Sequence, residues 1–293
     1  MLSIKRQHSL IKSALIISVF LCHFVSTAVL AESESISKQS KIYSVGIIPQ
    51  FEARKLYAIW RPILDQLQKE TGLKFKFNSA SSITEFEKQL MAGKYDFAYM
   101  NPFQPILTQK TQGYIPLVRD HSKNLQGILV VRKDSTLTDI SQLNGTTIAF
   151  PSPNALGASL MLRAELINQH NIKFIPSYVV THDSVYLNVV YNKVAAGGGV
   201  EKTFNWQSNA IKDKLRILYR TKTVAPHPLA VHPRIEKSIS QRVQQALLKI
   251  SSSGKGKRLL AKIPIKKPGI ATLDDYRALA DMGLEKILTM DSL

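Results

Sequence analysis

The chain has 293 residues, 44% of them hydrophobic and 20% charged, which is typical of a folded protein and excludes a disordered one. Its formal net charge of +18 means that any cleft would attract anions, although a basic exported protein that sits near anionic lipid headgroups has the same composition. The single cysteine, Cys22, excludes an internal disulfide.

Residues 1–31 have the pattern of an export signal. Basic residues come first, then an apolar run over 14–30 that ends in Ala31 before Glu32. We expect a cleaved signal peptide, which would also remove Cys22. A retained membrane anchor is the alternative, but the run is short for a bilayer span and polar residues interrupt it.

Strands and helices alternate in the next part of the chain. The apolar patterns predict a strand over 42–48, a helix over 55–71, a strand over 73–77, a helix over 82–92 and a strand over 95–100. This order predicts a mainly parallel sheet with helices on both faces, whose ligands bind beyond the carboxyl ends of the strands. Those ends lie at 49–51, 78–80 and 101–103.

A second, similar region follows two further strands, at 114–118 and 127–132. It has an expected strand over 147–150, a helix over 156–168, a strand over 177–180, a segment over 183–191, a glycine turn at 197–199 and a strand over 215–219. The chain then returns through 221–228 to a strand at 229–231. Helices over 238–251, 256–261 and 273–288 are expected to pack on the first region.

Together these elements predict an α/β protein of two lobes, each a mainly parallel sheet flanked by helices. We assign residues 41–132 and 223–293 to lobe 1 and residues 133–222 to lobe 2. Two crossover segments between lobes can act as a hinge that closes on a ligand.

Residues 147–159 carry the most informative local pattern. A strand turns through Pro151 and Pro153 and then opens a helix, so free backbone N–H groups and the positive end of the helix dipole face the region beyond the strand. Gly157 and Ala158 would let a ligand approach the backbone closely. An ordinary strand-to-helix turn that binds nothing is the alternative.

Other residue patterns argue against catalysis, metals and nucleic acid. His182 and Asp183 are adjacent, a spacing that rarely forms a catalytic dyad, and no Gly-x-Ser-x-Gly motif accompanies them. The histidines match no metal-site spacing, and the basic cluster near Arg258 lacks interleaved aromatic residues. We therefore expect no enzyme activity, no cofactor, no metal and no nucleic-acid partner.

Several motifs together carry a resemblance to a known family. They are the opening strand with Pro49, residues 60–67 running into Thr71-Gly72, residues 92–102, residues 143–145 before 149–153, and residues 182–185. In these segments the chain resembles the solute-binding proteins of phosphate, phosphite and phosphonate ABC importers, which have the type II periplasmic binding-protein fold.

The resemblance implies a phosphonate group held between the lobes by a tyrosine-bearing strand end, a helix start and a histidine segment. The matching ligand-binding residues are Tyr99, Asn101, Asn154, Ala155, Leu156, Gly157, Ala158, His182 and Ser184. The chain departs from the family where Asn154-Ala155-Leu156 stands in place of a Ser-Thr-Ser series before the glycine. Three hydroxyl donors are therefore missing. Either the ligand is bulkier and less charged, or Asn154 and Ser159 supply some of the missing hydrogen bonds.

We therefore predict an exported, monomeric binding protein of the periplasm. It would capture a small oxyanion or phosphonate-like ligand between its lobes and deliver it to an ABC permease in the inner membrane. A ligand-sensing protein that docks on a membrane sensor kinase is the alternative. An enzyme is a third, weaker interpretation, because no nucleophile, base and oxyanion site are assembled in the sequence.

Overall fold

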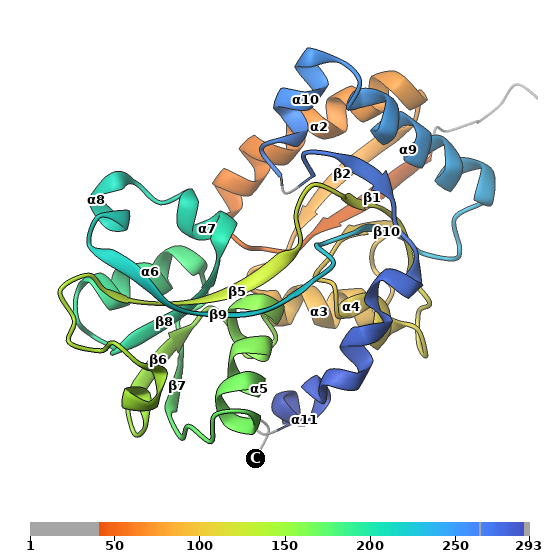
Figure 1. The fold of residues 1–293 in the computed structure, drawn as a ribbon. Coiled ribbons are helices and arrows are strands. Elements are labelled where there is room, and N and C mark those ends of the chain that lie inside the picture. The colour runs from red at the N-terminus through yellow and green to blue at the C-terminus, as the bar shows by residue number, and fades with distance from the viewer. Residues whose placement is uncertain (1–40, 264, 290–293) are drawn as a thin grey trace, which may run out of the picture. The chain divides into compact units, whose positions relative to one another are not determined.

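The computed structural model describes residues 41–263 and 265–289, which form two mixed β-sheets flanked by helices (Figure 1). The expected signal peptide, residues 1–31, lies outside the described residues. Among the described helices none is both long and apolar enough to cross a membrane.

The first sheet has six strands in the order β11-β4-β10-β3-β1-β2. Its bounds are β1 Ile42–Ile47, β2 Lys74–Ser79, β3 Phe97–Tyr99, β4 Ile115–Asp120, β10 Leu229–Val231 and β11 Pro268–Ile270. β1 pairs in parallel with β2 and β3, whereas β10, β4 and β11 pair antiparallel with their neighbours. The helices of this region are α2 Ala53–Thr71, α3 Ile83–Met91, α4 Gln104–Thr108, α9 Lys237–Ile250 and α10 Gly254–Leu260.

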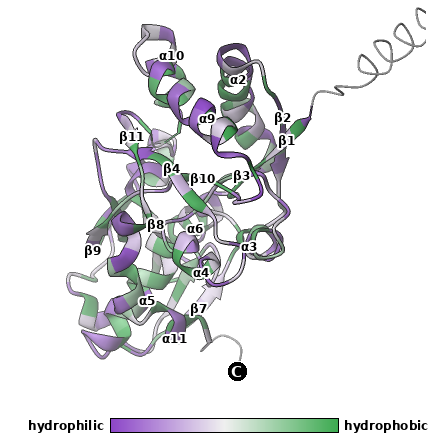
Figure 2. Cartoon of the chain, turned by 90° about the vertical axis from the view of Figure 1, so that its right-hand side faces the viewer, coloured by the Kyte–Doolittle hydropathy of each residue, from purple (hydrophilic) through white to green (hydrophobic). Residues whose placement is uncertain are grey.

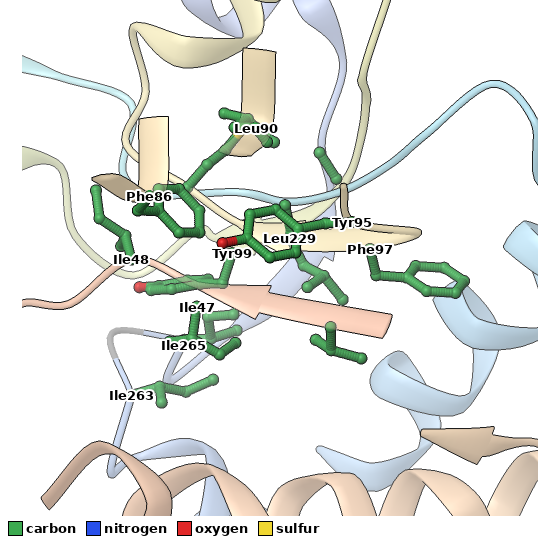
Figure 3. Packing of buried hydrophobic residues seen from close by; sticks show 14 of the residues in the cluster. Ile47, Ile48, Phe86, Leu90, Tyr95, Phe97, Tyr99, Leu229, Ile263 and Ile265 are labelled. Carbon is green, nitrogen blue, oxygen red and sulfur yellow. The ribbon is translucent and has the colours of Figure 1, made fainter. Parts of the chain in front are cut away.

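Helix α2 shows why these elements form where the sequence predicts them. Its buried residues Leu56, Ile63 and Leu67 recur at helical spacing. The helix ends at Gly72, whose φ of 68° suits glycine and whose N–H donates to Gln68 O at 2.8 Å. Figure 2 shows hydrophilic and hydrophobic residues on both α2 and α9, as expected of helices with one buried face, and Figure 3 shows apolar side chains of β1, α3 and β3 in the core they cover.

The second sheet has five strands in the order β7-β6-β8-β5-β9. Its bounds are β5 Leu125–Arg132, β6 Thr147–Phe150, β7 Ile175–Tyr178, β8 Ala196–Val200 and β9 Leu215–Val224. The helices here are η1 Ile140–Leu143, η2 Leu156–Leu160 with α5 Met161–Asn168, α6 His182–Val190, α7 Glu201–Asn205 and α8 Asn209–Lys212.

The alternating side chains of β5 explain how two helices cover this sheet. Leu129 and Val131 share a buried cluster with residues of α5, whereas Ile128 and Val130 share another with residues of α6. Successive side chains of a strand point to opposite faces, so α5 and α6 lie on opposite faces of the sheet.

The fold class predicted from the sequence is confirmed, with one refinement of the sheets. Both are mixed: the parallel strands lie at one side of each sheet (β3, β1 and β2 in the first, β7, β6 and β8 in the second), and antiparallel strands follow at the other. The boundary expected after residue 132 does not coincide with the change of sheet, since β5 pairs with β8 and β9 along its length. The chain changes sheets between Asp120 and Leu125.

The glycine turn expected at 197–199 is wrong, because these residues form the buried strand β8. A Cβ at Gly197 would lie 2.6 Å from Val185 Cγ1, and one at Gly198 would lie 2.1 Å from Ala158 O. The glycines therefore let α6 and η2 approach the sheet backbone, a packing role that leaves no hydrophobic pattern in the sequence.

The C-terminal segment also differs from expectation. It forms two helices, η3 Leu273–Met282 and α11 Leu284–Thr289, in place of one. They join the core of the first sheet, but α11 also reaches the second region, where Arg163 Nη2 donates to Ile287 O at 3.1 Å.

Candidate functional site

The loops after β3 and β6 are in contact and join the two regions. Asn101, just after β3, accepts hydrogen bonds at Oδ1 from the N–H of Phe103 (2.9 Å) and of Gln104 (3.1 Å). Its Nδ2 donates across to Asn154 O at 3.3 Å. Asn101 therefore both holds the turn before α4 and contacts the second region.

Asn154 makes a second contact between the two regions. Its Nδ2 donates to the carboxylate of Glu87 on α3, and its Oδ1 accepts from Ser152 Oγ at 2.7 Å. Burial raises the pKa of Glu87, against the lowering effect of its hydrogen bonds. In this conformation the side chain of Asn154 holds α3 rather than facing a ligand.

The helix start after Asn154 offers free backbone donors. Ser159 N and Leu160 N both donate to Ala155 O, at 2.7 and 3.1 Å, so the N–H groups of residues 156–158 precede the first helical hydrogen bond. Gly157 packs closely on β5, since a Cβ at Gly127 would lie 2.1 Å from Gly157 O. Small residues thus seat this helix start directly on the second sheet.

His182 is the first residue of α6 and is buried. Thr181 caps the helix by accepting from Ser184 N at 3.1 Å, and His182 Nδ1 lies 3.2 Å from Thr203 Oγ1 on α7. Burial lowers the pKa of His182 to about 4, so the imidazole is neutral at pH 7. Nδ1 is engaged with Thr203, which leaves Nε2 for another partner.

A second buried histidine, His227, lies on the returning crossover between β9 and β10. Its Nε2 is 3.2 Å from Gln50 Nε2, and its ring stacks on Tyr99 with centroids 5.5 Å apart. Burial, and to a smaller extent the nearby His182, lowers the pKa of His227 to about 3. Tyr99 Oη is buried, and no residue that the structure describes forms a hydrogen bond with it.

A cavity of about 20 Å³ lies between the two regions. Of the residues predicted from the sequence, Asn101, Ala155, Leu156, Gly157, Ala158 and His182 line it. Three do not line it: Tyr99 packs behind His227, Asn154 contacts Glu87, and Ser184 bonds to Thr181 Oγ1 at 2.8 Å.

Neither His227 nor Gln50 is among the ligand-binding residues predicted from the sequence, although Gln50 lies in the strand end at 49–51. The remaining lining residues are Ile48, Ile83 and Val200. The Pro-His-Pro run at 226–228 is the available signal for His227, because a crossover segment borders the cleft. No group of three or more histidine, cysteine, aspartate or glutamate residues could hold a metal ion within residues 41–263 and 265–289.

A two-lobe α/β fold with a small cavity between the lobes is the architecture of periplasmic binding proteins. The model of the family described as "ABC transporter, phosphonate, periplasmic substrate-binding protein" matches residues 45–276, and the chain belongs to that family. The resemblance seen in the sequence is thereby confirmed. Members are exported substrate-binding proteins, not enzymes, that bind small anionic ligands and work with an ABC permease.

Individual relatives are distant in sequence but similar in fold. The "Phosphate-import protein PhnD" of Mycolicibacterium smegmatis is 20% identical over 222 residues, which are 69% of this chain and 69% of that protein. The structure of a binding protein component of an ABC phosphonate transporter from Pseudomonas aeruginosa superposes with a TM-score of 0.76 at 15% identity, covering 85% of this chain and 87% of that chain. The structure of PhnD1 from Prochlorococcus marinus in complex with methylphosphonate superposes with a TM-score of 0.76 at 16% identity. The match covers 85% of this chain and 99% of that chain.

Proposed function

We propose that this protein captures a small oxyanion or phosphonate-like ligand between its two lobes and delivers it to an ABC importer. The observation that carries the proposal is the pair of buried histidines, His182 and His227, that line one small cavity with the free N–H groups of residues 156–158. His182 lies on α6 and His227 on the crossover between β9 and β10, so the two come together only in the folded chain.

The chemistry of these groups suits a tetrahedral oxyanion. Such a ligand needs donors that converge from several directions, and backbone N–H groups, the Asn101 amide and an imidazole N–H can supply them without a fixed salt bridge. Both histidines are neutral at pH 7, so each can donate one proton or accept one from a ligand hydroxyl.

The size of the cavity implies that binding requires motion. About 20 Å³ holds roughly one water molecule, which is less than a phosphonate group needs. We infer that the lobes separate at the crossovers, residues 121–124 and 225–228, and close again on the ligand. Opening would break the contacts of Asn154 with Glu87 and with Asn101.

The walls of the cavity favour a ligand with some apolar surface. Leu156, Ile48 and Val200 line it, and the segment at 154–156 lacks the three hydroxyl donors typical of the family. An organic phosphonate presents both an oxyanion and an apolar group, so we expect it to bind more tightly than inorganic phosphate or sulfate.

A thermal-shift screen tests ligand capture. The purified protein is melted with phosphate, phosphite, methylphosphonate, aminoethylphosphonate or sulfate, with chloride at equal ionic strength as the control. A ligand at 100 times its dissociation constant stabilises by about 2.7 kcal/mol, which raises the melting temperature by about 5 °C or more in a protein of this size. If none of the five anions raises it beyond chloride, the proposal is wrong.

Delivery needs a separate test with the importer. The ATPase rate of the reconstituted permease and its nucleotide-binding subunit is measured with the liganded and the ligand-free protein. Stimulation by the liganded form supports delivery, and equal rates contradict it.

A further inference from the structure

A larger cavity of about 230 Å³ adjoins the small one. Gln50, Val200 and His227 line both cavities, so the two share a wall. The larger cavity lies among the first crossover, the start of α7 and the segment around Ile263.

Three lysines give this larger cavity a positive character. Lys123 comes from the crossover, Lys202 from α7 and Lys266 from the segment before β11. Within the described part of the chain none of the three forms an ion pair with a carboxylate. Their charge is therefore available to an anion in the cavity.

The two carboxylates that line the cavity already have partners. Glu201 pairs with Arg220 Nη1 at 3.3 Å. Asp120 accepts from Lys267 N at 2.8 Å and from Ser122 Oγ at 2.7 Å. A ligand ammonium group would have to compete with these contacts.

Of the three lysines, Lys202 is the best placed to contact a ligand. Its Nζ donates to Lys262 O at 3.1 Å and lies 5.0 Å from the centre of the Trp206 ring. Burial, and after it the nearby Lys266, lowers the pKa of Lys202 to about 7 against the opposite effect of Asp120. An anion bound beside Lys202 would favour its charged form.

An aromatic pair forms one side of the cavity. Trp206 lines it and stacks on Phe51 with ring centroids 5.2 Å apart and an interplanar angle of 16°. Lys55 Nζ lies 4.1 Å from the centre of the Phe51 ring and 3.7 Å from Asp183 Oδ2. This wall offers apolar contact to the body of a ligand whose charged end reaches the lysines.

The small cavity, in contrast, has neutral walls. Its polar residues are Gln50, Asn101, His182 and His227, and no lysine or arginine among the described residues lines it. An oxyanion there has hydrogen-bond donors but no countercharge. We propose that the larger cavity receives a second anionic group of the same ligand, so that the preferred solutes are organic phosphonates with a carboxylate at the far end, not those ending in an ammonium group. This inference rests on the proposed function.

The test compares three phosphonates that differ only beyond the phosphonate group. Methylphosphonate, 2-aminoethylphosphonate and 3-phosphonopropionate are titrated calorimetrically into the wild-type protein at pH 7. We expect 3-phosphonopropionate to bind about tenfold or more tightly than 2-aminoethylphosphonate. Its carboxylate gains a charge-assisted hydrogen bond from a lysine, whereas the ammonium group of 2-aminoethylphosphonate is repelled by the lysines.

Single-lysine variants test whether the larger cavity causes this preference for a terminal carboxylate. Lys202→Met keeps the apolar stem and should lower the ratio of 3-phosphonopropionate to methylphosphonate affinity about tenfold. Lys255→Met, on α10 and outside the lining residues, should leave that ratio unchanged. Lys266→Met replaces Lys202→Met if the latter does not fold, as judged by its melting curve.

The outcomes separate the two proposals. If all three phosphonates bind but 3-phosphonopropionate has no advantage, or Lys202→Met leaves the ratio unchanged, the second anionic subsite is wrong and the proposed function stands. Tighter binding of 2-aminoethylphosphonate also overturns the subsite. If no phosphonate binds the wild type, the proposed function itself fails.

Discussion

His182 Nδ1 and Thr203 Oγ1 lie 3.2 Å apart and join the start of α6 to α7. Thr203 Oγ1 also lies 2.9 Å from Val200 O and 2.8 Å from Tyr186 Oη, so its hydroxyl is held in place. Because Nδ1 is engaged, the orientation of the imidazole and its remaining nitrogen are set by the protein before a ligand arrives. We regard Thr203 as a positioning residue for the site.

Replacing Thr203 tests that role. Thr203→Val keeps the shape but removes the hydroxyl, and we expect the affinity for methylphosphonate to fall about tenfold, as for the loss of one hydrogen bond to a buried group. Thr203→Ser retains the hydroxyl and should bind within about twofold of the wild type. Equal affinities of the valine and serine variants, measured by calorimetry, would show that Thr203 does not position His182.

The contact between Asn154 and Glu87 predicts energetic coupling between the two regions. In a cycle of Asn154→Ala, Glu87→Ala and the double variant, the free energy of unfolding in urea should show a coupling of about 1 kcal/mol. Glu85→Ala is the matched control, since its carboxylate accepts from Gln89 within α3 at 2.7 Å. Additive effects of Asn154→Ala and Glu87→Ala would mean that the contact does not hold the regions together.

The buried histidines predict a loss of stability in mild acid. Folding lowers the pKa of His182 from 6.5 to about 4 and that of His227 to about 3, so the unfolded chain binds more protons between these values. Stability is therefore complete above pH 6.5 and falls as the pH drops from 6.5 towards 4.

The melting temperature measured across that pH range checks this prediction. His182→Gln should flatten the fall, because glutamine does not titrate, whereas His170→Gln, which changes an exposed ring, should leave the fall unchanged. A wild-type melting temperature that is constant from pH 6.5 to 4.5 would contradict the burial of neutral histidines.

Much of the fold follows from local sequence patterns, and the exceptions depend on contacts with segments that are distant in the sequence. Helix α2 is predictable because Leu56, Ile63 and Leu67 repeat at helical spacing before Gly72. Strand β8 is not, since three consecutive glycines have no side-chain pattern and form a strand only because α6 and η2 pack against them.

In the site, too, one part is predictable from local sequence and another is not. Its helix start is predictable, because two prolines and a glycine mark the turn out of β6. His227 reaches the cavity only through the return of the chain between β9 and β10, a long-range arrangement that no local pattern encodes.

The packing role of the glycines gives a further prediction. Gly198→Ala would place a Cβ 2.1 Å from Ala158 O and should destabilise the protein by about 1–3 kcal/mol. Gly254→Ala is the matched control, because the nearest atom to its Cβ would be Arg258 Nη1 at 3.7 Å. We expect that variant to unfold in urea within about 0.5 kcal/mol of the wild type. Equal stability of both variants would contradict the close seating of η2 on β8.

The central claim is that a phosphonate binds between His182, His227 and the helix start at residues 156–158. Calorimetric titration of methylphosphonate into the wild type, His182→Gln and His170→Gln tests it most directly. We predict saturable binding at one site per chain, weakened about tenfold or more by His182→Gln and unchanged by His170→Gln. Binding to His182→Gln with wild-type affinity would contradict the proposed site.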